Sequence, residues 1–227
     1  MRVVLMLLLL PIYVIAQDIP KVHLLYPPDG IIFDRSFCPQ FTKTEVKPEW
    51  VQETVRRRAE LQALWDTEGP KYLETAMSEI GSPFPYREMQ AYLTVCAVGG
   101  SMSMPLLINM RPFLASTATI PGLRWPEWYF AGLVFHELMH HYVGPVLPMS
   151  QLRRKYSSEV PQTQNHLHVM ALEKVVFSRL RLGRVLKILE GYRTNAPPAY
   201  KRAWEIVNDV EGEHAFIAEL KSLRAQN

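Results

Sequence analysis

The stretch FHELMHH at residues 135–141 decides the fold, because it places three histidines and a glutamate inside an apolar segment. That segment runs from about Pro126 to Val143 and is apolar almost all round, which predicts a buried central helix. On a helix His136 and His140 lie four positions apart, so both imidazoles leave the same face one turn apart. Two neutral imidazoles in this arrangement can bind one Zn²⁺.

The remaining polar residues of this stretch have separate expected roles. Pro126 suits the first position of the helix, and Gly144 suits the cap at its end. One step along a helix turns Glu137 about 100° away from His136, so we expect Glu137 to be a general base on a water at the metal and not a ligand. His141 points away from both imidazoles, and we expect it to be structural.

A catalytic zinc keeps three protein ligands and one open position, so a third ligand is required. The metzincin pattern is excluded, because Gly144 falls one position too late and residue 146 is Val. Residues 126–183 resemble the gluzincin clan of thermolysin-like zinc metallopeptidases, through the His-Glu-x-x-His motif and a downstream helix. The resemblance implies a zincin-like fold, hydrolysis of peptide bonds, and Glu173 as the third ligand. The long connection is closer to that of clostridial neurotoxin light chains, and position 177 is Phe where the clan has an acidic residue.

Two histidines on the same predicted helix, at about 163–183, are alternatives to Glu173. Five of the seven histidines lie between positions 136 and 168, a cluster that core packing does not require. We place His168 next in order as the third ligand, then His166, and then Glu159. His166 and Glu173 stand about 10 Å apart on a helix, so they cannot both bind one ion. A member of this group that is not a ligand is expected to orient one.

Such sites also use a side chain that stabilises the oxyanion formed during the reaction. The candidates in this chain are Tyr156, Tyr192 and His214.

The first 16 residues have the pattern of an export signal, with Arg2 at the start, an apolar core and small or branched residues near Ala16. The apolar run is too short for a comfortable membrane span. We therefore expect a signal peptide at 1–16, a mature single domain at 17–227, no stable membrane anchor after cleavage, and a periplasmic or secreted protein. An uncleaved anchor is the alternative.

Composition and cysteine content agree with one exported globular domain. The chain has 227 residues, 48% of them hydrophobic and 21% charged, with a net charge of +3. The basic run at 56–58 fits a solvated helix face, and no basic block with interleaved aromatics predicts nucleic-acid binding. Cys38 and Cys96 suggest one disulfide in an oxidising compartment, with two separate buried thiols as the alternative.

Periodicity predicts an α+β fold that is mainly helical, with a small sheet before the metal-binding helix. Strands are expected near 22–26, 30–33, 89–98 and 104–114. Helices are expected at about 48–67, 70–80, 126–143, 163–183, 184–192, 198–207 and 211–224. Pro105 and Pro112 restrict the strand at 104–114 to an edge, where an extended peptide could pair with it. A hairpin that only packs on the helix is the alternative.

These features predict an exported zinc metallopeptidase that acts on a peptide or protein substrate. One alternative is a zinc hydrolase of a non-peptide amide or a cell-wall crosslink, because the motif specifies water activation and not the acyl group. Another is a non-catalytic metal-binding or partner-binding protein. The sequence does not define the oligomeric state.

Overall fold

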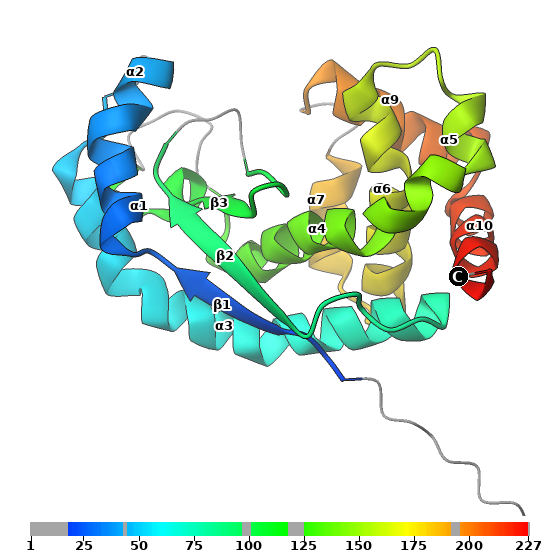
Figure 1. Cartoon of the computed structure of the whole chain (residues 1–227), viewed down its shortest axis with the longest axis horizontal. Coiled ribbons are helices and arrows are strands. Elements are labelled where there is room, and N and C mark those ends of the chain that lie inside the picture. The colour runs from blue at the N-terminus through cyan, green and yellow to red at the C-terminus, as the bar shows by residue number, and fades with distance from the viewer. Residues whose placement is uncertain (1–17, 43–44, 97–100, 118–124, 192–195, 227) are drawn as a thin grey trace, which may run out of the picture.

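The computed structural model describes residues 18–42, 45–96, 101–117, 125–191 and 196–226. Figure 1 shows the sheet and the first helices on one side of the molecule and the C-terminal helices on the other. The long helix α3 (Pro48–Ile80) runs beneath both parts, and α4 (Phe130–Val143) lies between them. The expected α+β, mainly helical fold is confirmed. The predicted export signal lies outside the described residues.

The sheet has three parallel strands in the order β1-β2-β3. They are β1 (Lys21–Leu25), β2 (Glu88–Thr94) and β3 (Leu107–Asn109). The long connection from β1 to its parallel neighbour β2 includes α3, and parallel strands require such a crossover. All three strands lie within or across stretches that were predicted as strands.

β3 is shorter than predicted, and it is an edge strand of the sheet whose outer side is partly covered. Leu107 exchanges backbone hydrogen bonds of 2.8 and 2.9 Å with Met102, on the side away from β2. After Asn109 the chain turns into short 3₁₀ turns at Arg111–Phe113 and Ala115–Thr117. At Leu107 the chain's own residues therefore occupy the outer side of the strand where a peptide was expected to pair.

Two predictions in the N-terminal half are wrong. Residues 30–33 do not form a strand but belong to α1 (Pro28–Ile32) and the π-helical turn Phe33–Phe37, which leads into α2 (Cys38–Thr42). Pro28 and the acidic Asp29 occupy the first turn of α1, where both residue types are favourable. The predicted break at Pro70 is also absent, because α3 continues through it.

The N-terminal helices are bound to the end of β2 by a disulfide and a buried carboxylate. Cys38 and Cys96 form the disulfide, which confirms the expected pairing. Asp34 is fully buried and accepts hydrogen bonds from Thr94 Oγ1 at 2.5 Å and from the Val95 amide at 2.9 Å. Burial raises the pKa of Asp34, and these donors partly offset that effect.

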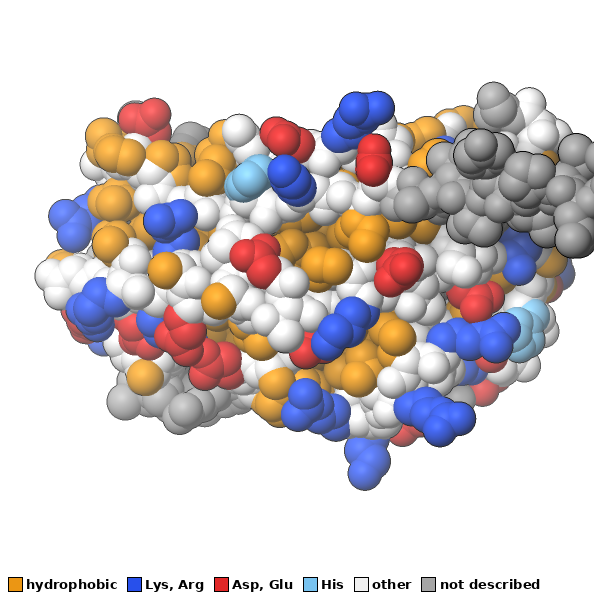
Figure 2. All heavy atoms as spheres, turned by 90° about the horizontal axis from the view of Figure 1, so that it is seen from below, with side chains coloured by type: hydrophobic (Ala, Val, Ile, Leu, Met, Phe, Trp, Pro, Cys, Tyr) orange, Lys and Arg blue, Asp and Glu red, His pale blue; other side chains and the backbone are white. Residues whose placement is uncertain are grey.

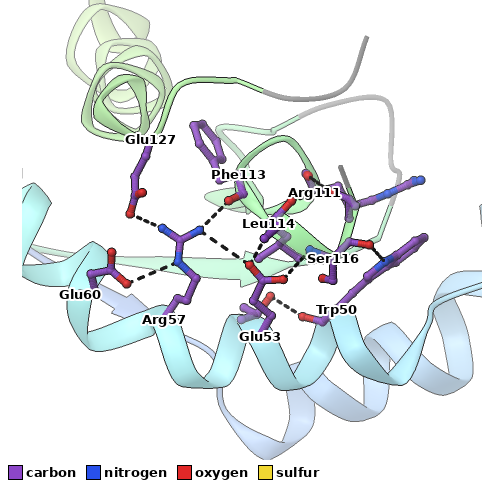
Figure 3. Close-up of polar contacts among 12 residues, drawn as sticks. Trp50, Glu53, Arg57, Glu60, Arg111, Phe113, Leu114, Ser116 and Glu127 are labelled. Carbon is purple, nitrogen blue, oxygen red and sulfur yellow. Dashed lines mark hydrogen bonds and ion pairs between the residues drawn. The ribbon is translucent and has the colours of Figure 1, made fainter. Parts of the chain in front are cut away.

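Helix α3 also holds the segment that leads to α4 (Figure 3). The Glu53 carboxylate accepts from the backbone amides of Ala115 at 2.6 Å and Ser116 at 2.8 Å. The Arg57 guanidinium donates to the Phe113 carbonyl at 2.5 Å and to the carboxylate of Glu127. The middle residue of the basic run at 56–58 therefore makes specific contacts, and the start of α4 is fixed from the α3 side.

Among its described residues, the C-terminal part consists of helices joined by turns and contains no strand. A 3₁₀ turn at Glu127–Tyr129 precedes α4. Gly144 is the C-terminal cap of α4 and has right-handed helical geometry. The predicted position of the cap at Gly144 is therefore confirmed, and a 3₁₀ helix follows at Gly144–Met149. The remaining helices are α5 (Gln151–Lys155), α6 (Pro161–Arg179), α7 (Gly183–Glu190), α9 (Pro198–Glu205), a π-helical turn (Ile206–Val210) and α10 (Glu213–Ala225).

Helix α4 packs against α3 on one side and α6 on another, which makes it the centre of the core. Figure 2 shows the surface on the α3 side of the molecule, which is the view from below Figure 1. Charged groups of both signs are interspersed there with apolar side chains. Within the part of the chain that the structure describes, every helix is too short or too polar to cross a membrane.

Candidate metal centre

The motif on α4 faces a cleft of about 400 Å³ between the sheet side and the helical side of the molecule. Glu137 and His140 line its floor. The segment Ser101–Met104, which we call the cleft wall, lines the sheet side. The helical side is lined by Gln162, Asn165 and His166 of α6 and by Tyr200 of α9.

Three imidazoles converge at this floor. One ring nitrogen from each of His136, His140 and His166 lies within 4.8 Å of the other two. The Nε2 atoms of His136 and His140 are 3.4 Å apart. In a tetrahedral zinc site with Zn–N bonds of about 2.0–2.1 Å, neighbouring nitrogens lie about 3.3 Å apart. The spacing of the first pair therefore fits a shared ion.

The hydrogen bonds of two of these rings define which nitrogen faces the others. His136 donates from Nδ1 to Glu173 Oε2 at 3.0 Å, and His166 donates from Nδ1 to the Gln162 carbonyl at 2.6 Å. With Nδ1 protonated, each neutral ring keeps its lone pair on Nε2. Such outer partners commonly fix the tautomer of histidine ligands in metal sites. When all three rings are neutral, the group offers three imidazole nitrogens, a donor set that suits Zn²⁺.

Glu173, the predicted third ligand, is not part of this group. It is fully buried on α6 and contacts the ring nitrogen of His136 that faces away from His140. Its second oxygen, Oε1, has no hydrogen-bond partner among the described residues. Its contact with His136 is the one expected of a residue that orients a ligand.

His166, His168 and Glu159 lie in three different environments. His166, placed after His168 in the prediction, is the residue that α6 brings beside His136 and His140. His168 is fully buried and bonds instead to Glu219 of α10, with 2.7 Å between Nε2 and Oε2. Glu159 accepts from Arg202 at 2.8 Å. Neither His168 nor Glu159 belongs to the group of three.

Burial and mutual proximity control the charges of the imidazoles. Burial lowers the pKa of His140 to about 2 and that of His166 to about 3, with the neighbouring His136 contributing in both cases. Burial would also lower the pKa of His136, but the charge and hydrogen bond of Glu173 outweigh it and raise that pKa to about 9. A cation bound among the three nitrogens would compete with this proton.

Glu137 has the properties of a general base beside this group. It is only 6% exposed, and burial raises the pKa of its carboxyl to about 7. A base with a pKa near the working pH is effective at proton transfer. Its side chain reaches the cleft that His140 and His166 also line.

Tyr200 is a site residue that the sequence did not indicate. Its ring centroid lies 4.2 Å from that of His166, and its hydroxyl is hydrogen-bonded by the Gln162 side chain. Of the three predicted helpers, Tyr156 bonds to Glu211 away from the cleft, and the side chain of His214 is 87% exposed. Tyr192 lies outside the described residues. Only the proximity of α9 to α6 in the fold brings Tyr200 to the site.

No family model matches this chain, and neither a curated protein nor a solved structure matches it. A function therefore has to be argued from the chemistry of the cleft.

Proposed function

We propose that the protein is an exported zinc-dependent hydrolase that cleaves peptide bonds. The observation that carries this proposal is the convergence of three imidazole nitrogens beside a buried carboxyl in an accessible cleft. His136, His140 and His166 would hold the ion, which leaves a fourth position for water or substrate. A purely structural site would not require an acid such as Glu137 at that position.

Each residue of the cleft has a separate role in the proposed reaction. A zinc ion held here would act as a Lewis acid that polarises a carbonyl and lowers the pKa of water. Glu137 accepts the proton of the attacking water and passes it to the leaving nitrogen. Tyr200, oriented by Gln162, donates a hydrogen bond to the oxyanion that develops on the substrate. Glu173 holds the ring of His136 in its ligating tautomer.

A peptide substrate is supported by the shape and lining of the cleft. The cleft wall lines the same cleft as Glu137 and His140, and an extended chain could lie against it. The opposite side carries the amides of Gln162 and Asn165, which can donate to or accept from a peptide backbone. Export is supported by the disulfide, which persists in oxidising compartments.

The test is a comparison of the wild-type chain with Glu137→Gln. Both proteins should bind one zinc ion with similar affinity, and a library of unmodified peptides should be cleaved only by the wild type. A wild-type protein that binds no zinc, or a Glu137→Gln protein with full peptidase activity, would contradict the proposal. Amide or cell-wall substrates assayed in parallel identify the alternative class if peptides are not cleaved.

A further inference from the structure

The cleft wall Ser101–Met104 is held on its sheet side by β3. Met102 pairs with Leu107 through two backbone hydrogen bonds, and the amide of Asn109 donates to Ser101 Oγ at 3.0 Å. Beyond Met102 the chain turns, and Met104 is 78% exposed. These contacts fix the wall to the sheet, but they do not fix its distance from the metal-binding helix.

One side chain makes that second connection. His141 Nε2 donates a hydrogen bond of 2.6 Å to the carbonyl oxygen of Ser103. The imidazole also packs edge-on against the ring of Tyr86, with centroids 6.2 Å apart. A half-buried side chain of α4 therefore joins the helix of the metal group directly to the wall of the cleft.

The position of His141 directly after His140 on α4 links the cleft wall to the metal group. It follows His140 immediately, so one imidazole faces the metal group while the next points about 100° around the helix. The two rings share a rigid backbone turn. The hydrogen bond to Ser103 therefore couples the distance between the cleft wall and α4 to the position of the metal ligands.

We propose that His141 is a positioning residue, which sets the distance between the cleft wall and the metal group and thereby the affinity and register of an extended peptide. This inference rests on the proposed function. Because the Ser103 carbonyl is already an acceptor for His141, it is less available to a substrate amide.

Two substitutions separate the hydrogen bond from the packing of the ring. His141→Phe keeps an aromatic ring beside Tyr86 but cannot donate. His141→Gln carries an amide nitrogen at a position similar to Nε2 and can donate to the Ser103 carbonyl. His214→Phe, at an exposed position of α10, is the matched control for introducing a phenyl group.

For His141→Phe we expect KM for a peptide to rise about tenfold, the effect of one lost hydrogen bond, with kcat changed much less. The sites cleaved in a peptide library should broaden or shift, while zinc stoichiometry stays at one. Amide hydrogen exchange in residues 101–104 should become faster. His141→Gln should restore all of these properties toward wild type, and His214→Phe should not change them.

The inference is overturned if His141→Phe retains the wild-type KM, cleavage sites and exchange rates, or if His141→Gln is as impaired as His141→Phe. The exchange measurement requires neither zinc nor activity. A wild-type protein without peptidase activity would contradict the proposed function. Unchanged hydrogen exchange in His141→Phe would contradict the positioning role of the His141–Ser103 hydrogen bond.

Discussion

Glu173 Oε2 lies 3.0 Å from Nδ1 of His136, and His140 Nε2 lies 3.4 Å from the other nitrogen of the same ring. The imidazole of His136 is thus held between a buried carboxylate and the other members of the candidate metal group. In the proposed centre, this arrangement separates Glu173, which would orient a ligand, from the residues that would bind the ion.

The first prediction follows from that separation. Glu173→Gln should weaken zinc binding by about 10–100-fold without abolishing it, the usual effect of losing an outer-shell partner. His166→Ala should reduce zinc affinity far more, because it removes a donor atom. Competition with a chromophoric chelator measures both constants. If Glu173→Gln abolished binding while His166→Ala retained it, Glu173 would be the ligand.

The second prediction concerns the phenol in the cleft. Tyr200→Phe should lower kcat by about 10²–10³-fold, as for loss of one oxyanion donor, with zinc affinity nearly unchanged. Tyr156→Phe is the matched control, because its hydroxyl bonds to Glu211 and not to the cleft. Steady-state kinetics on one peptide suffices. Equal kcat values for Tyr200→Phe and wild type would remove Tyr200 from the mechanism.

The third prediction is a pH dependence of stability outside the metal group. Burial would raise the pKa of Glu219, but hydrogen bonds from His168, Ser150 and the Leu152 amide outweigh it and lower that pKa to about 2. Because the pKa of Glu219 is lowered, its contribution to stability is fully present above the ordinary glutamate pKa of about 4.5. It is lost as the pH falls toward 2.

Glu219→Gln should therefore lower the melting temperature most at neutral pH, and the difference from wild type should shrink between about pH 4.5 and 2. Thermal unfolding followed by circular dichroism measures this difference across the range. Glu49→Gln, an exposed carboxylate on α3, is the control. A difference that grows as the pH falls would have the wrong sign for this account.

The fourth prediction concerns the disulfide, which closes a sequence separation of 58 residues. Replacing Cys38 and Cys96 together by alanine should lower the free energy of unfolding by about 4 kcal/mol in the chain-entropy model. Urea denaturation of the double variant, compared with reduced and oxidised wild type, measures the change. Equal midpoints for the variant and the oxidised wild type would show that the disulfide contributes nothing.

Local patterns predicted the part of the site that lies on one helix. The spacing of His136, Glu137 and His140, together with the apolar surroundings, was sufficient to place them on the buried helix α4. The third member of the group could not be chosen in this way. Helix α6 is buried over most of its surface, so no apolar stripe shows which of His166, His168 and Glu173 faces α4.

Long-range packing explains the other differences. Tyr200 reaches the cleft only because α9 packs against α6, a contact that no local pattern contains. Pro70 was expected to end a helix, since it lacks a backbone donor and clashes with the preceding turn. Trp65, Tyr72 and Leu73 on either side are buried in the core, and their tertiary packing accompanies an uninterrupted α3.

Zinc binding by the wild type and by His166→Ala tests the central claim most directly. Equilibrium dialysis followed by elemental analysis, with X-ray absorption at the zinc edge, reports stoichiometry and ligand type together. The account predicts one tightly bound zinc with three imidazole nitrogens in the wild type, and no comparably tight zinc in His166→Ala. A wild-type protein without zinc, or a His166→Ala protein that binds it equally well, would contradict the proposed centre.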